Sequence, residues 1–126
     1  IVYDNQMSIA ENPGGLYRNL QRLRETNGQA PCNFFKAMGV DYLYVKDGND
    51  VQALVDAVQR VKDIDHPIVV HINTLKGKGF KFAEQQQERF HYSIPFSLET
   101  GELLVDLGNA EDYADLTAEY LLHEMQ

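Results

Sequence analysis

The segment spanning residues 41–72 constrains the fold more than any other part of the sequence. Residues 41–45 are rich in Tyr and Val, and residues 68–72 form an uninterrupted apolar run of strand length. Between them lies a helix-like pattern with one apolar face, made of Val51, Leu54, Val55, Val58 and Val61. A strand, a helix and a second strand at this spacing predict a parallel crossover, with the second strand covered by helices on both faces.

Weaker patterns precede this unit. Residues 1–3 are typical of the end of a strand, and because the chain opens on Ile1 rather than Met, we expect sequence to be missing upstream. Three leucines between residues 16 and 23 predict a helix that stops near residue 27. Pro31 could open a second short helix, and Gly39 stands where a left-handed cap would end it.

Composition narrows the class of partner. The 126 residues are 44% hydrophobic and 24% charged, as in an ordinary globular domain, and the apolar runs are too short to span a membrane. A formal charge of −8 argues against a nucleic-acid or anionic-membrane surface. One cysteine, Cys32, excludes an intrachain disulfide and multi-cysteine metal motifs, which fits a reducing compartment.

Polar side chains follow all three expected strands, and ligands of parallel sheets bind beyond the carboxyl ends of the strands. The residues at these three ends are Asp4 and Asn5, then Asp47, Asn49 and Asp50, then Thr74, Lys76 and Lys78. The oxygens suit a hard cation such as Mg²⁺, and the basic glycine-containing loop suits phosphate. The alternative is that these residues only form turns, which favour Asp, Asn and Gly.

The four histidines have different expected roles. His71 lies in an apolar strand, so we expect a hydrogen-bonded core or edge residue, while His66 and His123 are expected at the surface. His91 follows Phe90 in an irregular segment, where flanking aromatic residues could hold it over a site.

Several segments in series resemble one enzyme family. They are Asp4-Asn5-Gln6-Met7-Ser8-Ile9, Gly14-Gly15-Leu16, Asp47-Gly48-Asn49-Asp50, Thr74-Leu75-Lys76-Gly77-Lys78-Gly79-Phe80 and Phe90-His91. Their order and spacing are similar to those of 1-deoxy-D-xylulose-5-phosphate synthase, a thiamine-diphosphate enzyme of the transketolase superfamily. The resemblance implies Mg²⁺ and thiamine diphosphate as cofactors, and a reaction that joins pyruvate to glyceraldehyde 3-phosphate with loss of CO₂.

The resemblance also implies roles for individual residues. Asn5 and the backbone carbonyl of Met7 match the metal-binding positions, and Ile9 matches a position near the thiazolium ring. Lys76 and His91 match polar catalytic positions near the diphosphate and the substrate. Phe80 matches a position that contacts the cofactor, where many relatives carry Tyr. Since Phe lacks the hydroxyl, we do not expect a polar role for Phe80.

Departures from the family pattern leave room for a divergent branch. Tyr3 replaces the usual first Asn of the Asn-Asp-Asn triplet, Asn49 replaces a usual His, and the stretch between Leu16 and Phe34 is shorter than in typical synthases. The upstream Gly-Asp-Gly motif and the glutamate that activates the aminopyrimidine have no counterpart in the sequence.

The resemblance therefore predicts part of a three-layer, parallel-sheet α/β fold that binds thiamine diphosphate. Residues 1–84 would be the C-terminal half of the diphosphate-binding domain. Residues 83–108 lack clear periodicity, which is typical of a long loop, and 85–108 would be the active-site loop and interdomain connection. Residues 109–126 would be the first helix of the pyrimidine-binding domain. We expect this chain to be inactive without the rest of its polypeptide, and the whole enzyme to be a cytoplasmic homodimer.

Two other functions stay open. One is a transketolase-type ketol transfer, or another 2-oxoacid reaction, with the same cofactor. The other is a non-catalytic association module whose polar strand ends are ordinary turns.

Overall fold

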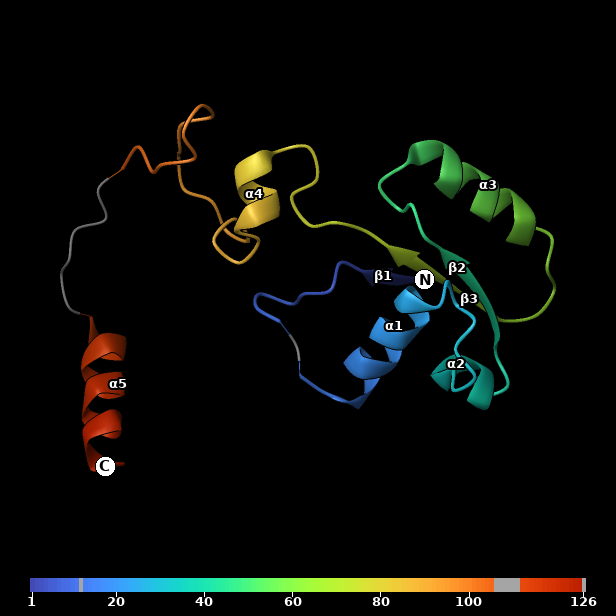
Figure 1. Ribbon diagram of the computed structural model, residues 1–126, viewed down its shortest axis with the longest axis horizontal. Coiled ribbons are helices and arrows are strands. Elements are labelled where there is room, and N and C mark those ends of the chain that lie inside the picture. Colours follow the sequence, from blue (N-terminus) through green and yellow to red (C-terminus); the bar gives the residue numbers. More distant parts are fainter. Residues whose placement is uncertain (12, 106–111, 126) are drawn as a thin grey trace. The chain divides into compact units, whose positions relative to one another are not determined.

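The computed structural model describes residues 1–11, 13–105 and 112–125 (Figure 1). The chain divides into two compact units, Ile1–Ser93 and Ile94–Gln126, and each is considered separately. The first unit contains the sheet and every predicted site residue. No helix among the described residues is long and apolar enough to cross a membrane.

The sheet of the first unit has three parallel strands in the order β1-β3-β2. They are β1 (Val2–Asp4), β2 (Asp41–Val45) and β3 (Ile68–Asn73), and helix α3 (Val51–Val61) joins β2 to β3. The register aligns Val2 of β1 and Tyr44 of β2 with His71 at the middle of β3. The predicted crossover and the α/β class are therefore confirmed.

Helices cover both faces of this sheet (Figure 1). Between α3 and the sheet, Ala57 of the helix forms a buried apolar cluster with Val45 of β2 and Val70 of β3. The opposite face carries α1 (Gly15–Glu25) and α2 (Phe34–Ala37), where the ring of Phe35 stacks on Tyr42 with centroids 5.7 Å apart. One face is thus apolar, and the other mixes aromatic and polar groups.

The predicted buried face of α3 is wrong in part. Leu54 and Val61 pack against the apolar cluster, but Val51, Val55 and Val58 are 74%, 46% and 57% exposed. Apolar residues, Ala53 and Ala57 among them, cover about half of the circumference of this helix. The small side chain of Ala57 lets that part of the helix pack against the sheet. The side of α3 that is buried is therefore rotated about the helix axis relative to the side predicted from the valines.

The two ends of α2 are set by local capping residues. Asn33 caps α2, because its Oδ1 accepts hydrogen bonds from the Phe35 and Lys36 amides at 3.0 and 3.3 Å. Pro31 lies before this cap, so the prediction that it opens the helix is wrong. Gly39 has a φ of 77° just after α2, which confirms the left-handed cap.

Two further helices follow β3. Helix α4 (Lys81–Gln85) lies partly in the stretch expected to be irregular, because five residues are too few to show a period. In the second unit, Phe96 and Leu103 form an isolated antiparallel bridge, and α5 (Tyr113–Glu124) confirms the closing helix. The remaining residues of that prediction, 109–111 and 126, lie outside the described residues, and 112 and 125 flank the helix.

Candidate functional site at the carboxyl edge of the sheet

The loops after β2 and β3 are joined by three hydrogen bonds. Gly48 N donates to the Asn73 carbonyl at 2.9 Å, and Asn73 Nδ2 donates to the Lys46 carbonyl at 3.2 Å. Leu75 N donates to Asn49 Oδ1 at 2.7 Å. A Cβ at Gly48 would come within 2.4 Å of the Asn73 carbonyl, so this close contact needs glycine. The Asp47-Gly48-Asn49-Asp50 turn therefore fixes the start of the loop that carries Lys76.

A hollow of about 460 Å³ lies at this edge, lined in part by Lys46, Asp47, Thr74 and Lys78. Thr74 is only 4% exposed, and in the described part of the chain its Oγ1 has no hydrogen-bond partner. The hollow is therefore polar and of mixed charge. The side chain of Asp50, one of the predicted cation ligands, caps α3 through the Gln52 amide at 2.8 Å.

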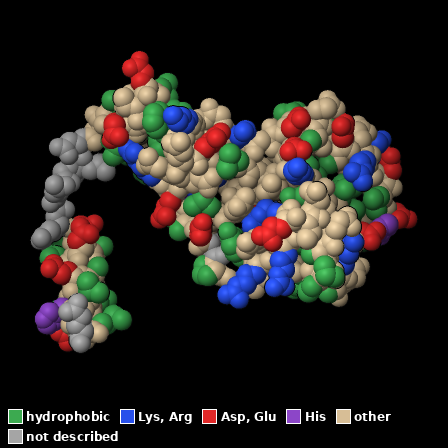
Figure 2. Space-filling model, in the orientation of Figure 1, with side chains coloured by type: hydrophobic (Ala, Val, Ile, Leu, Met, Phe, Trp, Pro, Cys, Tyr) green, Lys and Arg blue, Asp and Glu red, His purple; other side chains and the backbone are tan. Residues whose placement is uncertain are grey.

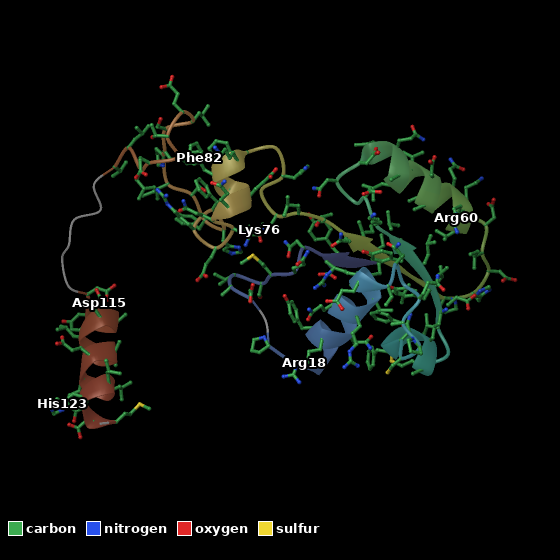
Figure 3. The ribbon with its side chains drawn as sticks, in the orientation of Figure 1. Arg18, Arg60, Lys76, Phe82, Asp115 and His123 are labelled. Atoms are coloured by element: carbon green, nitrogen blue, oxygen red, sulfur yellow. The ribbon has the colours of Figure 1, made fainter. Side chains whose placement is uncertain are left out.

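Lys76 connects three segments of the first unit (Figure 3). Its Nζ donates to the Ser8 carbonyl at 3.3 Å and lies 3.1 Å from His91 Nδ1. Because an ammonium group only donates, Nδ1 of His91 is the acceptor, and the proton of the neutral ring is on Nε2. Two residues predicted to share a site, Lys76 and His91, are in direct contact.

The turn after β1 holds the two predicted metal ligands. Asn5 Oδ1 accepts a hydrogen bond from Met7 N at 3.1 Å, and Gln6 between them has a left-handed φ of 67°. A carboxamide oxygen and a backbone carbonyl are donors of the kind that Mg²⁺ prefers. Among the described residues, no group of three His, Cys, Asp or Glu side chains could hold a metal. The donors thus fit Mg²⁺ in kind, but two are fewer than its usual six ligands.

Asp4 does not offer a free ligand, contrary to its expected role at the strand end. Its Oδ2 accepts from His71 Nε2 at 2.7 Å and from Arg24 Nη1 at 2.5 Å, and its Oδ1 accepts from Gln6 N at 3.0 Å. Burial favours a higher pKa for Asp4, but the bonds from His71 and Arg24 outweigh it and lower the pKa to about 2. The carboxylate is therefore ionised and fully engaged inside the protein.

His71 continues this buried network toward β2. It is fully buried, and its Nδ1 lies 2.6 Å from the hydroxyl of Tyr42. Burial raises the pKa of Tyr42, so the phenol keeps its proton and is available as a donor to Nδ1. Nε2 faces the ionised Asp4, so both ring nitrogens have a hydrogen-bond partner. The prediction of a hydrogen-bonded core histidine is confirmed.

Sequence reasoning missed the network as a unit. Its members come from β1, α1, β2 and β3, so no local spacing shows them together. A polar residue inside an apolar strand was the one available signal, because a buried histidine needs partners. His66 and His123 are exposed, as expected, with side-chain exposures of 52% and 84%.

The remaining two predicted residues differ in their surroundings. Ile9 is 60% exposed on the turn after β1. The ring of Phe80 contacts the rings of Phe82 and Phe90 edge-on, with centroids 5.5 and 5.6 Å apart. This aromatic cluster packs against the segment that leads to His91.

Charges are mixed over the visible face of the molecule, where acidic and basic side chains are interspersed (Figure 2). With a net charge of −8, the chain as a whole repels anions. An anionic ligand at the sheet edge would therefore depend on nearby lysines, of which Lys46, Lys76 and Lys78 lie on the edge loops.

The structure defines a class of protein: a parallel α/β domain with a polar edge beyond its strands, where sheets of this kind bind their ligands. Comparison with known proteins then specifies the family. A family model described as 1-deoxy-D-xylulose-5-phosphate synthase matches residues 25–74, which include β2, α3, β3 and the turn around Gly48. The chain is homologous to a segment of these synthases.

Curated relatives extend the match over most of the chain. The 1-deoxy-D-xylulose-5-phosphate synthase of Myxococcus xanthus is 37% identical over 96% of this chain, and that of Caldanaerobacter subterraneus is 33% identical over 90%. The corresponding synthase of Clostridium beijerinckii is 34% identical over 81% of the chain. The chain spans about a fifth of the length of these relatives: 20%, 18% and 22%, respectively.

Proposed function

We propose that this chain forms part of the cofactor site of a thiamine-diphosphate-dependent transferase of the 1-deoxy-D-xylulose-5-phosphate synthase type. The whole protein would join pyruvate to glyceraldehyde 3-phosphate with release of CO₂, for isoprenoid and thiamine precursor synthesis, as a cytoplasmic homodimer. The observation that carries the proposal is the contact of Lys76 with the Ser8 carbonyl and His91 at the sheet edge. Synthase relatives that cover up to 96% of the chain support it.

In this proposal the turn after β1 holds Mg²⁺. Asn5 Oδ1 already accepts one hydrogen bond from Met7 N, and a carboxamide oxygen has a second lone pair for a cation. The carbonyl of Met7 is the second donor. Phosphate oxygens, water and groups outside this chain would complete the coordination of the metal.

Lys76 would bind the anionic diphosphate of the cofactor, and His91 would donate a proton to the substrate. The Lys76 ammonium, oriented by Ser8 and His91, offers positive charge to a diphosphate in a chain that is otherwise acidic. His91 holds its ring proton at Nε2, the nitrogen that faces away from Lys76, and can donate it to a substrate oxygen. When bound, thiamine diphosphate supplies the electron sink for carbon–carbon bond chemistry.

Ile9 and Phe80 would supply the apolar part of the site. The exposed side chain of Ile9 is available to pack against a cofactor ring. Phe80 contacts Phe82 and Phe90, so its ring supports the segment that carries His91. Since Phe80 has no hydroxyl, its contribution to a cofactor would be packing alone.

The domain assignment is part of the same proposal. Residues 1–84 would belong to the diphosphate-binding domain, 85–108 to the active-site loop and connection, and 109–126 to the pyrimidine-binding domain. Because this chain offers two oxygen donors for a six-coordinate metal, we expect it to be inactive by itself.

The test is the variant Asn5→Ala in the full-length protein. We expect Mg²⁺-dependent affinity for thiamine diphosphate, measured by calorimetry, to fall at least about 10-fold, because a metal ligand is lost. Gln59→Ala, an exposed amide on α3, is the matched control and should leave the affinity unchanged.

Three outcomes separate the candidate functions. Glyceraldehyde-3-phosphate-dependent CO₂ release from pyruvate supports the synthase, whereas cleavage of xylulose 5-phosphate favours transketolase-type ketol transfer. If Asn5→Ala leaves cofactor affinity at the level of the control, the metal-site assignment is wrong. An association module is then the better description.

A further inference from the structure

The buried carboxylate of Asp4 directly precedes the turn that contains Asn5 and Met7. Its oxygens receive hydrogen bonds from β3 through His71, from α1 through Arg24 and from the turn through Gln6 N. Its backbone carbonyl receives a further bond from Thr74 N at 2.9 Å. Asp4 is thus fixed from four directions, and its side chain is only 4% exposed.

The turn after Asp4 has a conformation that needs such support. Gln6 has a φ of 67°, in the left-handed region that L-residues with a Cβ rarely adopt. Its amide donates to Asp4 Oδ1 at 3.0 Å, and the next amide, of Met7, donates to Asn5 Oδ1 at 3.1 Å. The position of the Asp4 carboxylate therefore sets the direction in which the turn leaves the sheet.

The division of donors between the two carboxylate oxygens is informative. Arg24 and His71 both donate to Oδ2, which leaves Oδ1 for the Gln6 amide. The two side chains thereby fix the rotation of the carboxylate, and the carboxylate fixes Gln6. This chain of contacts links the buried face of the sheet to the edge.

We propose that Asp4, His71 and Arg24 are positioning residues that hold the Asn5–Gln6–Met7 turn in its ligand-presenting conformation. The metal part of this inference rests on the proposed function, because it takes Asn5 and Met7 as the ligands. Residues that orient metal ligands typically change metal affinity about 10- to 100-fold when they are replaced. The alternative is that the network only stabilises the sheet.

The variant Asp4→Asn separates these two roles. A carboxamide has one acceptor oxygen, and the two donors Arg24 and His71 will draw it to their side. Its NH₂ group then faces the Gln6 amide, donor against donor, and the turn loses its anchor. The side-chain volume hardly changes, so the sheet should still form.

The matched control is Tyr42→Phe. It removes the hydrogen bond at the far end of the network, to His71 Nδ1, and leaves every contact of Asp4 in place. A purely structural network predicts that both variants lose stability and affect the turn alike. A positioning network predicts that only Asp4→Asn loosens the turn.

The first measurement is hydrogen exchange of the full-length protein, read by mass spectrometry on peptides that cover residues 5–9, with β3 as the internal reference. We expect Asp4→Asn to accelerate exchange of residues 5–9 at least about 10-fold relative to β3, and Tyr42→Phe to change this ratio less than about twofold. Equal behaviour of the two variants overturns the proposal.

The second measurement is Mg²⁺-dependent binding of thiamine diphosphate by calorimetry. A dissociation constant raised at least about 10-fold by Asp4→Asn, with Tyr42→Phe close to wild type, supports the positioning role. Unchanged affinity in Asp4→Asn overturns it. If the wild-type protein binds no Mg²⁺ and thiamine diphosphate, the proposed function fails, and the exchange result alone decides whether the network positions the turn.

Discussion

Two histidines, His66 just before β3 and His71 within it, make the same contact in opposite surroundings. His66 Nε2 lies 2.7 Å from Asp41 Oδ2, and His71 Nε2 lies 2.7 Å from Asp4 Oδ2. The side chain of His66 is 52% exposed, whereas that of His71 is fully buried. The distance is identical, so any difference in effect comes from burial and from the other partners of each ring.

The two contacts should contribute very differently to the stability of the fold. Water screens the exposed pair, and holding two mobile side chains together costs conformational entropy. At the buried pair, removal of one partner leaves polar groups without water or a substitute hydrogen bond. The second partner of His71 is the hydroxyl of Tyr42, whereas the second partner of His66 is the fully exposed carboxylate of Asp65. The contact distance alone therefore does not show which of the two pairs stabilises the protein more.

The largest expected effect is the loss of stability in His71→Ala. Because Asp4 and Tyr42 lose their buried partner, we expect the free energy of unfolding to fall by about 3–5 kcal/mol. Urea denaturation followed by circular dichroism measures it. His66→Ala is the matched variant at the exposed site and should remain close to wild type. Similar losses in the two variants would remove the distinction between the histidines.

The crossover at the centre of the fold could be predicted from local signals. Asp50 caps α3 through the Gln52 amide, and the apolar run of β3 supplies a strand buried on both faces. Each of these features depends on residues close together in the chain. The same applies to Gly39, whose left-handed φ follows directly from its place after α2.

Other features depend on packing between distant segments. The buried side of α3 was mispredicted because Ala53 and Ala57 extend the apolar side of the helix beyond the valines, and the packing of Ala57 on the sheet fixes which part of that side is buried. Likewise, the inward direction of the Asp4 side chain depends on Arg24, twenty residues later, and on His71 in a neighbouring strand. Neither relation is visible as a spacing in the sequence.

For the candidate site, the sequence suggested the residues but not the contacts between them. Lys76 was suggested by its place after a strand and His91 by its aromatic neighbours, and the family resemblance then put the two in one site. The structure places their nitrogens 3.1 Å apart. Asn49 was expected as an oxygen donor at the end of a strand, and as a departure from the family pattern. Its actual contact, with the Leu75 amide, requires knowledge of how the loops after β2 and β3 meet.

Asn49 offers an intermediate case between the two histidines, since it makes one hydrogen bond across a partly exposed edge. We expect Asn49→Ala to lower the free energy of unfolding by about 1 kcal/mol and to accelerate amide exchange at Leu75. Asn49→Asp keeps an acceptor oxygen and is the control, with exchange near wild type. If both variants exchange alike, the Asn49 side chain does not hold this loop.

The smallest expected effect concerns the pH dependence at His66. Hydrogen bonds to Asp41 and then to Asp65 raise the pKa of His66 above its ordinary value of 6.5. The protonated form is thus favoured in the folded chain, so its stabilising contribution is present below the ordinary pKa and is lost as pH rises through the raised value. Titration of the ring protons by NMR measures the pKa directly. In Asp41→Asn the pKa should fall back toward 6.5. An unchanged value would mean that the 2.7 Å contact has no electrostatic effect at the exposed site, and the contrast with His71 would then be larger still.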